Sequence, residues 1–387
     1  YLKKGKQDWI TSILLSILLP NKLFTTQQNT LFSLNMYYFQ HTLGCQMNEY
    51  DTRAYENTLI QFGWLRTEDI YQADLIFLNT CAVRDKTIKK AQSFLGLAAK
   101  IKKEKPDLIV VLTGCASELV LHELKWKSYI DFVWGALNQA ESPSSFEAFL
   151  IRKGFKKTNQ NQIYPSGFSA NIPIMFGCDS FCTYCIVPYL RGREKSIPFS
   201  GIINQIDRVV SSNLREVVLL GQNVNHYGFD SKPVASFAQL LEELAKRYPT
   251  LFFDFLTSHP RDFDLDILRV MQDYPNIYRH FHLPAQHGDN QILRCMNRGY
   301  TKEKYLGLVE EIRYRFPMST LSTDLIVGFP GETEEAFQQT VDLVERAKFD
   351  MVFAAQYSKR PGTPAEKYPD QIPESVKKDR INTLLNI

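Results

Sequence analysis

The chain has 387 residues, which is long enough for two domains that each bury a hydrophobic core. Its hydrophobic fraction of 44% and charged fraction of 22% are ordinary for a globular protein. The net charge of +3 is nearly balanced, which excludes nucleic-acid binding through overall charge and leaves only local basic patches. Seven cysteines without a disulfide-type framework point to a reducing compartment.

Residues 1–35 form an unusual opening. Three lysines precede an apolar stretch at residues 9–19, which imitates a secretory signal, yet no small-residue cleavage site follows it. The stretch is also shorter than the roughly 20 apolar residues of a transmembrane helix. The chain begins with Tyr1, and Met36 directly precedes the first patterned strand. We therefore expect Met36 to be the native initiator and residues 1–35 to be a non-native or disordered extension.

From residue 36 onward, strand-like runs alternate with helical runs. Strands are expected at residues 36–42, 75–79, 108–113 and 130–134, and helices at 48–62, at 85–103 and from Ser117. This alternation predicts a parallel α/β sheet with right-handed crossovers. We assign residues 36–140 to this N-terminal α/β domain. Residues 141–170, which include Pro143 and a basic run at 152–157, are expected to be a linker.

Three cysteines of the N-terminal domain each follow an expected strand. Cys45, Cys81 and Cys115 lie just beyond the carboxyl ends of the runs at 36–42, 75–79 and 108–113. Because the carboxyl ends of parallel strands line the crevice where α/β sheets bind ligands, we expect the three thiols to meet at one edge. The alternative is that each is a buried structural cysteine.

The alternation starts again after the expected linker. Strands are expected at residues 172–176, 216–220, 252–256, 279–283, 323–327 and 351–356, separated by helices near 200–211, 236–247, 264–273, 302–315 and 333–347. Six β/α units over residues 171–375 predict an open, partial (β/α)6 barrel, with functional groups at the carboxyl ends of its strands. Residues 376–387 are expected to begin a further C-terminal region.

The first of these strands is followed by a tight triplet, Cys178, Cys182 and Cys185. Three thiolates hold three irons of a cubane cluster and leave the fourth iron open for a substrate or cofactor. Zinc would require a fourth Cys or His at ligand spacing, and none lies nearby. A disulfide fits poorly with the intracellular composition. The triplet therefore favours an iron–sulfur cluster over these two alternatives.

This C-x₃-C-x₂-C triplet resembles the signature of the radical S-adenosylmethionine (SAM) enzymes. The resemblance implies that the amine and carboxylate of SAM chelate the open iron. Reductive cleavage of the sulfonium then gives a 5′-deoxyadenosyl radical. Tyr184 matches the family position that packs beside the adenine.

The chain from Met36 to about Arg380 resembles the methylthiotransferase family, which joins a three-cysteine domain to a radical SAM barrel. The matching stretches are Gly44-Cys45-Gln46-Met47-Asn48-Glu49-Tyr50-Asp51, Asn79-Thr80-Cys81-Ala82-Val83-Arg84, Arg191-Gly192-Arg193-Glu194, Arg298-Gly299-Tyr300-Thr301, residues 324–332 and residues 360–364. The run Leu220-Gly221-Gln222-Asn223-Val224-Asn225 resembles the MiaB-type branch, which acts on tRNA.

The resemblance implies conversion of N6-isopentenyladenosine to 2-methylthio-N6-isopentenyladenosine next to the anticodon. It implies two 4Fe-4S clusters as well as SAM, with sulfur delivered from the cluster of Cys45, Cys81 and Cys115 and the methyl group from a second SAM. Two alternatives stay open. One is a methylthiotransferase that acts on N6-threonylcarbamoyladenosine in tRNA, and the other is a non-catalytic iron–sulfur or zinc RNA-binding module.

Several further positions have roles implied by the resemblance. Gln222 and Asn223 occupy the place of the motif that holds the SAM amine, since their side-chain carbonyls are acceptors. Gln286 and Asp324 lie at strand ends and are expected to bind ribose or carboxylate. The arginines are expected to contact the SAM carboxylate or RNA phosphate, where planar bidentate donors suit; they are Arg191, Arg193 and Arg360. Cys295 is expected to be an inert helix residue.

The expected partners are the anticodon stem-loop of tRNA, a reductant such as flavodoxin or ferredoxin, and an iron–sulfur or sulfur carrier protein. We expect a cytoplasmic monomer that does not bind a membrane. Two departures from the family accompany these expectations. His287 stands where the family has Ser, in Gln286-His287-Gly288, and is predicted to change the positioning near the adenosyl group. The family's C-terminal RNA-binding β-barrel domain (TRAM) is expected to be missing after Ile387, which should weaken RNA affinity.

Overall fold

The computed structural model describes residues 35–82, 85–117, 127–135, 142–158, 168–210, 213–230 and 235–387. One compact unit runs from Met36 to Ile387. The expectation about the first 35 residues therefore falls almost entirely outside the described residues, as does most of the helix expected from Ser117. No helix within the described ranges combines the length and apolar character needed to cross a membrane.

The N-terminal part is a parallel sheet with the strand order β2-β1-β3-β4-β5. Its strands are β1 (Met36–Thr42), β2 (Trp64–Arg66), β3 (Leu75–Thr80), β4 (Ile109–Gly114) and β5 (Phe132–Val133). The accompanying helices are α1 (Gln46–Gln61), α2 (Asp85–Glu104), the short η1 (Lys127–Tyr129) and α4 (Ser142–Arg152). The predicted parallel α/β domain is confirmed, whereas the three-residue strand β2 was too short to predict.

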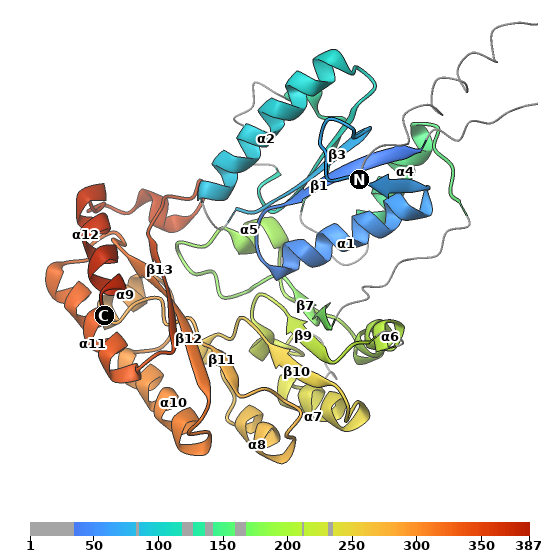
Figure 1. Cartoon of the computed structure of the whole chain (residues 1–387). Helices are drawn as coiled ribbons and strands as arrows, with labels where there is room; N and C mark the ends of the chain where they lie inside the picture. Colours follow the sequence, from blue (N-terminus) through green and yellow to red (C-terminus); the bar gives the residue numbers. More distant parts are fainter. Residues whose placement is uncertain are drawn as a thin grey trace, which may run out of the picture. The chain divides into compact units, whose positions relative to one another are not determined.

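Both faces of this sheet are covered, which explains why β3 and β4 are buried along their whole length. Leu75 and Phe77 of β3 pack in one core with Tyr55 of α1, whereas Ile76 and Leu78 pack in another core with residues of α2. Successive side chains of a strand point to opposite faces, so a strand buried on both faces reads as a continuous apolar run. Figure 1 shows α1 and α2 on the two sides of the sheet.

The second part contains six parallel strands in two three-stranded sheets, with the orders β10-β9-β6 and β11-β12-β13. The strands are β6 (Ser169–Pro173), β9 (Glu216–Leu220), β10 (Phe252–Phe255), β11 (His280–His282), β12 (Thr320–Val327) and β13 (Met351–Gln356). An isolated parallel bridge between Phe253 and Ile277 lies between the two sheets. The partial (β/α)6 barrel is confirmed, with an incomplete ladder between β10 and β11.

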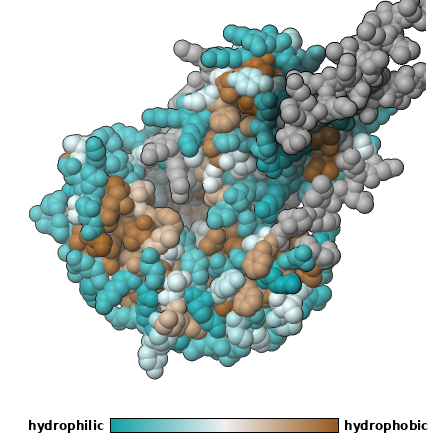
Figure 2. Space-filling model, in the orientation of Figure 1, coloured by the Kyte–Doolittle hydropathy of each residue, from teal (hydrophilic) through white to brown (hydrophobic). Residues whose placement is uncertain are grey.

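Helices follow the barrel strands and pack with them in one large core. They are α6 (Phe199–Val210), α7 (Phe237–Arg247), α8 (Asp266–Asp273), α9 (Asn290–Cys295), α10 (Lys302–Arg315), α11 (Glu334–Ala347) and α12 (Glu374–Leu385), with short turns η2 (Val224–His226), η3 (Pro260–Asp262) and η4 (Pro364–Lys367). Ser236 and Gln239 form a capping box at the start of α7, and Thr301 and Thr333 cap α10 and α11. Figure 2 shows a mostly hydrophilic face with several apolar patches.

One expected strand is divided in the structure. Residues 172–176 were predicted to form a single strand, but β6 ends at Pro173, and β7 (Met175–Phe176) pairs antiparallel with β8 (Lys195–Ser196). The chain therefore leaves the barrel sheet before the cysteine triplet. The hairpin formed by β7 and β8 brackets residues 177–194, so that this segment begins and ends at the same place.

The N-terminal sheet and the barrel share contacts close to the cysteines. Met47, two residues after Cys45, packs with Phe176, Val218 and Leu220 at the carboxyl end of the barrel sheet. Ile186, which follows Cys185, is buried in the core on the α2 side of the N-terminal sheet. The carboxyl ends of both sets of strands thus lie at one interface inside the compact unit.

Candidate active site

The N-terminal cysteines lie at the carboxyl ends of adjacent parallel strands. Cys45 is the N-terminal cap residue of α1, three positions after the end of β1, while Cys81 and Cys115 directly follow β3 and β4. Cys81 and Cys115 are buried, and Cys45 is exposed. Gly114 has φ +94°, and a Cβ atom there would lie 2.2 Å from the Oδ1 of Asn79. Only glycine therefore allows the end of β4 to approach β3 this closely.

Buried amide side chains tie the cysteine-bearing segments together. Asn48 donates from Nδ2 to Asn79 Oδ1 at 2.8 Å and to the Thr80 carbonyl at 2.9 Å. Asn79 donates in return to the Asn48 carbonyl at 2.8 Å. The thiol of Cys45 lies 3.4 Å from Asn48 Oδ1, and Thr80 Oγ1 donates to the Thr113 carbonyl at 2.7 Å. Fully satisfied buried networks of this kind fix one geometry.

Arg191 reaches this site from the barrel part of the chain. It ends α5 (Val187–Arg191), and its Nε donates to Cys115 Sγ at 3.1 Å while Nη2 donates to Asp51 Oδ2 at 2.9 Å. The side chains of Arg191 and Asp51 are 3% and 1% exposed, so the ion pair is fully desolvated. Burial raises the pKa of the Cys115 thiol to about 11, against the opposing charge of Arg191.

The charges of Cys81 and Cys45 also act on Cys115 and raise its pKa further, as expected for three neighbouring thiols. Arg360 is a second buried cation near this group. Burial lowers the pKa of its guanidinium, and the charge of Cys81 opposes that shift, so Cys81 lies close enough to interact with it electrostatically. Two barrel arginines thus supply positive charge where three thiolates would gather. Metal binding would remove the thiol protons that burial otherwise retains.

The second cysteine group lies on a loop fixed by its neighbours. Gly177 has φ +76°, and a Cβ atom there would lie 2.0 Å from the carbonyl oxygen of Arg193. The amide of Cys178 donates to the Gly192 carbonyl at 3.2 Å, and the amide of Asp179 donates to Glu194 Oε1 at 3.0 Å. These contacts hold the start of the loop against residues 192–194.

The segment after α9 holds the middle of the same loop. Asn297 donates from Nδ2 to the carbonyls of Ser180 at 3.0 Å and Phe181 at 3.1 Å. Thr183 donates from Oγ1 to the Cys295 carbonyl at 2.8 Å. The side chain of Cys295 packs against an apolar cluster around Phe329, as suits a residue that is not a ligand. The loop is therefore positioned from both sides.

Arg298 contacts the second group much as Arg191 contacts the first. It is buried, and its Nη1 donates to Cys182 Sγ at 3.3 Å, while Nε donates to the Tyr300 hydroxyl at 3.0 Å and Nη2 to the Pro284 carbonyl at 2.8 Å. Burial raises the pKa of Cys178, and raises that of Cys185 to about 12, with a further contribution from Cys182. The charges of Cys178 and Cys182 act on Cys185, so these three thiols are also neighbours.

Tyr184 lies between this cysteine group and an apolar cluster. Its ring meets Phe329 edge to face with centroids 6.5 Å apart, and burial raises the pKa of its hydroxyl. Arg298, Cys182 and Cys185 are close enough to act electrostatically on that hydroxyl. The predicted aromatic neighbour of the cofactor is thus placed beside the triplet.

A group of buried polar atoms follows the neighbouring strands β9 and β10. The atoms that have no hydrogen-bond partner among the described residues are Gln222 Oε1, Asn223 Oδ1, Asn225 Nδ2 and His259 Nε2. The other amide atom of Asn223 donates to Asp262 Oδ2 at 2.8 Å. Burial, assisted by the charge of Arg298, lowers the pKa of His259 to about 2, so its imidazole is neutral. Buried polar atoms are usually paired, and these offer acceptors and donors to an amine and a carboxylate.

The remaining predicted residues differ from one another in burial and in their contacts. Gln286 is buried with φ +69°, and its backbone bridges to Asp324 and Ile326 of β12. Asp324 is part-exposed, and its Oδ2 lies 3.4 Å from His282 Nε2. Arg193 is exposed, pairs with Asp179 at 3.2 Å and lies over the Phe181 ring. His287 is fully buried and lies 2.9 Å from Glu332, so it contacts this carboxylate within the fold.

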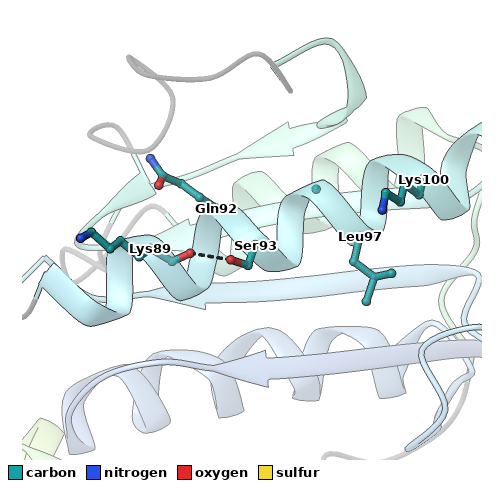
Figure 3. Close-up of a pocket in the computed structure, with 6 residues that line it drawn as sticks. Lys89, Gln92, Ser93, Leu97 and Lys100 are labelled. Atoms are coloured by element: carbon teal, nitrogen blue, oxygen red, sulfur yellow. Dashed lines mark hydrogen bonds between the residues drawn. The ribbon is translucent and has the colours of Figure 1, made fainter.

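A shallow hollow on α2 lies away from these groups. It has a volume of about 530 Å³ and is lined by Lys89, Gln92, Ser93, Gly96, Leu97 and Lys100. Figure 3 shows these side chains along α2, with Ser93 bonded to the Lys89 carbonyl. It contains no cysteine, and none of its residues was predicted to belong to the site.

The residues present fit two iron–sulfur clusters and SAM. In each three-cysteine group a sulfur accepts a hydrogen bond from a buried arginine. Among the unpartnered polar atoms after β9 and β10, Nε2 belongs to His259, which lies close enough to Arg298, the donor to Cys182, for the two to interact electrostatically. No disulfide joins cysteines of the described residues. Nor do three His, Cys, Asp or Glu side chains among those residues converge on a site for one metal ion. In a cubane cluster the three thiolates bind three different irons, so they are spaced more widely than thiolates that bind one ion.

Asn48, Asp51 and Arg298 were not predicted from the sequence as members of the site, whereas His259 follows the end of barrel strand β10, where functional groups were expected. Asn48, Asp51 and Arg298 stand in the stretches that matched the family, but their roles depend on distant partners. The available signal was a polar residue within an otherwise buried segment, since such residues require a partner. Arg191 was expected to meet SAM or RNA phosphate, and the structure instead buries it between Asp51 and Cys115.

Comparison with known proteins follows the same division. Residues 37–135 match the model of an uncharacterized protein family, UPF0004, and residues 172–344 match the radical SAM superfamily. Among solved structures, the radical SAM methyltransferase TsrM from Kitasatospora setae is similar with a TM-score of 0.61 at 14% identity, covering 86% of this chain and 77% of that one. A cobalamin-dependent SAM radical enzyme, OxsB, gives 0.55 at 13% identity and covers 90% and 56%. These likenesses support the fold.

Relatives that are closer in sequence carry one name. The tRNA-2-methylthio-N(6)-dimethylallyladenosine synthase of Carboxydothermus hydrogenoformans is 41% identical over 368 residues, which cover 90% of this chain and 82% of the relative. The protein of that name from Dictyoglomus thermophilum is 42% identical over 364 residues, with the same two coverages. At this identity over most of both sequences, the chain belongs to the family of tRNA-2-methylthio-N(6)-dimethylallyladenosine synthases.

Proposed function

We propose that this protein is a radical SAM methylthiotransferase that converts N6-isopentenyladenosine in tRNA, next to the anticodon, to its 2-methylthio form. The observation that carries the proposal is the presence of two three-cysteine groups in one compact unit, with Arg191 reaching from the segment of one to a thiol of the other. Family membership supports the same reaction.

When bound, SAM and the two 4Fe-4S clusters supply the radical that removes the C2 hydrogen, the sulfur and the methyl group. The chain's own residues position and enclose these groups. Cys178, Cys182 and Cys185 would hold the cluster that binds SAM, while Cys45, Cys81 and Cys115 would hold the cluster that provides sulfur. Holding the reacting atoms in line and excluding water and oxygen is the protein's main contribution.

The polar atoms after β9 and β10 would bind the amino-acid part of SAM. Gln222 Oε1 and Asn223 Oδ1 are buried acceptors that suit an ammonium group. His259 is neutral at physiological pH and keeps Nε2 for a ligand. Tyr184, beside Cys182 and Cys185, would pack against the adenine, and Gln286 and Asp324 would face the ribose at the same strand ends. Arg193 is exposed and would contact the SAM carboxylate or RNA phosphate at the entrance to the SAM site.

The substrate is a polyanion, so phosphate contacts should dominate its affinity. The basic runs at residues 102–105 and 152–157 are partly neutralised, because Lys102 pairs with Asp131 and Lys157 pairs with Glu147. The exposed lysines of α2, Lys89 and Lys100 among them, provide a further basic surface for the anticodon stem-loop. We also propose a reductant such as flavodoxin or ferredoxin, an iron–sulfur or sulfur carrier protein, and a monomer that works in the cytoplasm, where tRNA is modified.

The test is an anaerobic assay with reconstituted protein, SAM and tRNA that carries N6-isopentenyladenosine. We expect 5′-deoxyadenosine together with 2-methylthio-N6-isopentenyladenosine, detected by mass spectrometry of the tRNA nucleosides. Activity only on tRNA with N6-threonylcarbamoyladenosine would assign the protein to the other substrate. Bound iron or zinc without any deoxyadenosine would identify a non-catalytic RNA-binding module and overturn the proposal.

A further inference from the structure

Arg191, a side chain of the barrel part, donates a hydrogen bond to Cys115, a thiol of the N-terminal group. It lies six residues after Cys185, at the end of the short helix α5. A single short segment therefore carries both the ligands of the SAM cluster and a donor to the N-terminal cysteine site.

The geometry of Arg191 leaves one part of its guanidinium available. Nε is used by Cys115 Sγ at 3.1 Å, and Nη2 is used by Asp51 Oδ2 at 2.9 Å. Nη1 is buried and has no hydrogen-bond partner among the described residues. A buried, charged N–H group without a partner is costly, so its presence indicates that a ligand completes the site.

The chemistry of that ligand follows from the surroundings. The neighbouring groups are the thiols of Cys115 and Cys45, whose charges act on Arg191, and the thiol of Cys81, whose charge acts on Cys115. An anionic sulfur, either of the cluster itself or added to it, is the acceptor that would meet a guanidinium beside three thiolates. Hydrogen bonds to cluster sulfurs and the net local charge both set the reduction potential of an iron–sulfur cluster.

We propose that Arg191 is a positioning residue for the N-terminal cluster: it donates to the Cys115 thiolate and to a cluster sulfur, and Asp51 sets how much of its charge the cluster experiences. This inference rests on the proposed function. The arginine would raise the reduction potential of this cluster by stabilising its more negative, reduced state. It would also hold the sulfur that is transferred at a fixed place relative to the SAM loop.

The effect of replacing Asp51 on the reduction potential distinguishes this proposal from a role in packing alone. Its carboxylate neutralises part of the Arg191 charge, so Asp51→Asn should leave the guanidinium more positive toward the cluster and raise the potential. Arg191→Gln removes the cation and should lower the potential. Arg191→Lys keeps the charge but loses the planar fork, so its potential should lie between those of Arg191→Gln and the parent. A role in packing alone predicts no such opposite signs.

The potentials are measured in the full chain carrying Cys178→Ala, so that the N-terminal cluster is the one observed. Iron content, expected to be about four per chain, and the midpoint potential are followed by anaerobic redox titration with electron paramagnetic resonance. Arg247→Gln is the matched control, since Arg247 is exposed and pairs with Asp207 on the outer helices. We expect the control to match the parent, Arg191→Gln to fall below it and Asp51→Asn to rise above it.

A second readout uses protein with all its cysteines. Arg191→Gln should keep deoxyadenosine formation and lose about 10- to 100-fold in methylthiolation, the range typical of residues that support metal ligands. An unchanged potential in Arg191→Gln, or shifts of the same sign in Arg191→Gln and Asp51→Asn, would overturn the proposal. If Arg191→Gln loses its iron, the midpoint potential of the cluster in Asp51→Asn becomes the test. An unchanged potential in Asp51→Asn would reject the inference. An iron-free Cys178→Ala parent would instead refute the proposed N-terminal cluster itself.

Discussion

The two cysteine groups reach similar surroundings by different routes. Cys178, Cys182 and Cys185 lie on one loop, whereas Cys45, Cys81 and Cys115 come from the ends of three strands. Each group has one sulfur that accepts a hydrogen bond from a buried arginine, Arg298 in the first case and Arg191 in the second. The difference lies in what holds each arginine.

Arg191 is held by a carboxylate from the N-terminal domain, whereas Arg298 donates to neutral oxygens, the hydroxyl of Tyr300 and the carbonyl of Pro284. Arg298 thus keeps more of its charge for its cysteine site, and Arg191 shares its charge with Asp51. Under the proposed function, Arg298 is a fixed cation with neutral oxygen partners beside the SAM site. Arg191, beside the sulfur-providing cluster, shares its charge with Asp51 and links two parts of the chain.

The largest expected effect comes from removing one cysteine of each group. Cys178→Ala should abolish SAM cleavage, because the cluster that binds SAM loses a ligand. Cys81→Ala should leave SAM cleavage in place and end methylthiolation. Each variant should retain about four of the roughly eight irons of the parent protein. Iron analysis, deoxyadenosine assays and tRNA nucleoside mass spectrometry measure the three quantities. Methylthiolation by Cys81→Ala would contradict the division of labour.

Replacing Arg298 tests the fixed cation. Arg298→Gln should reduce SAM cleavage about 10- to 100-fold, because a support of the Cys182 ligand is lost. It should also lower the free energy of unfolding by about 1–3 kcal/mol, since Tyr300 and Pro284 lose a buried donor. The control is Arg294→Gln, four residues earlier, where the exposed arginine bonds Gln291. Equal SAM cleavage by the two variants would remove Arg298 from the site.

Replacing a buried acceptor after β9 should weaken SAM binding without affecting cluster assembly. Gln222→Ala should weaken SAM binding by about 10- to 150-fold, because one hydrogen bond to a charged group is worth about 1.5–3 kcal/mol. Both clusters should still assemble. Isothermal titration under anaerobic conditions gives the Kd, and Gln338→Ala, on the exposed side of α11, serves as the control. Unchanged SAM affinity in Gln222→Ala would show that its carbonyl does not face the cofactor.

The smallest effect concerns a pH-dependent support of the cysteine loop. Glu194 accepts from the Asp179 amide and also bonds His226, and this bond raises the pKa of His226. Because the folded pKa exceeds the unfolded value of about 6.5, the stabilisation is complete below that pH and is lost as pH rises through the folded pKa. The Tm difference between the parent and His226→Gln should therefore be larger near about pH 6 than near about pH 9. The reverse order would refute this reading.

The group of Cys178, Cys182 and Cys185 was predictable because the three residues lie within eight positions on one loop. For the N-terminal group, the sequence predicted only that each cysteine follows a strand, since parallel strands end at a common edge. The strand split at Pro173 was not predictable, because two residues carry too little pattern to show that they pair with β8. That His287 affects the adenosyl region stays a prediction, while its contact with Glu332, 45 positions along the chain, was not predictable from a local pattern.

The amino-acid sequence by itself determined the α/β class, the positions of the six cysteines and the family. These follow from short-range spacing and from the alternation of apolar and polar residues, which are properties of contiguous segments. The tertiary structure decided which side chains meet each thiol. Arg191 lies 76 positions from Cys115 and 140 from Asp51 along the chain, and Arg298 lies 116 from Cys182. Contacts over such separations depend on how the sheets pack, so no local pattern specifies them.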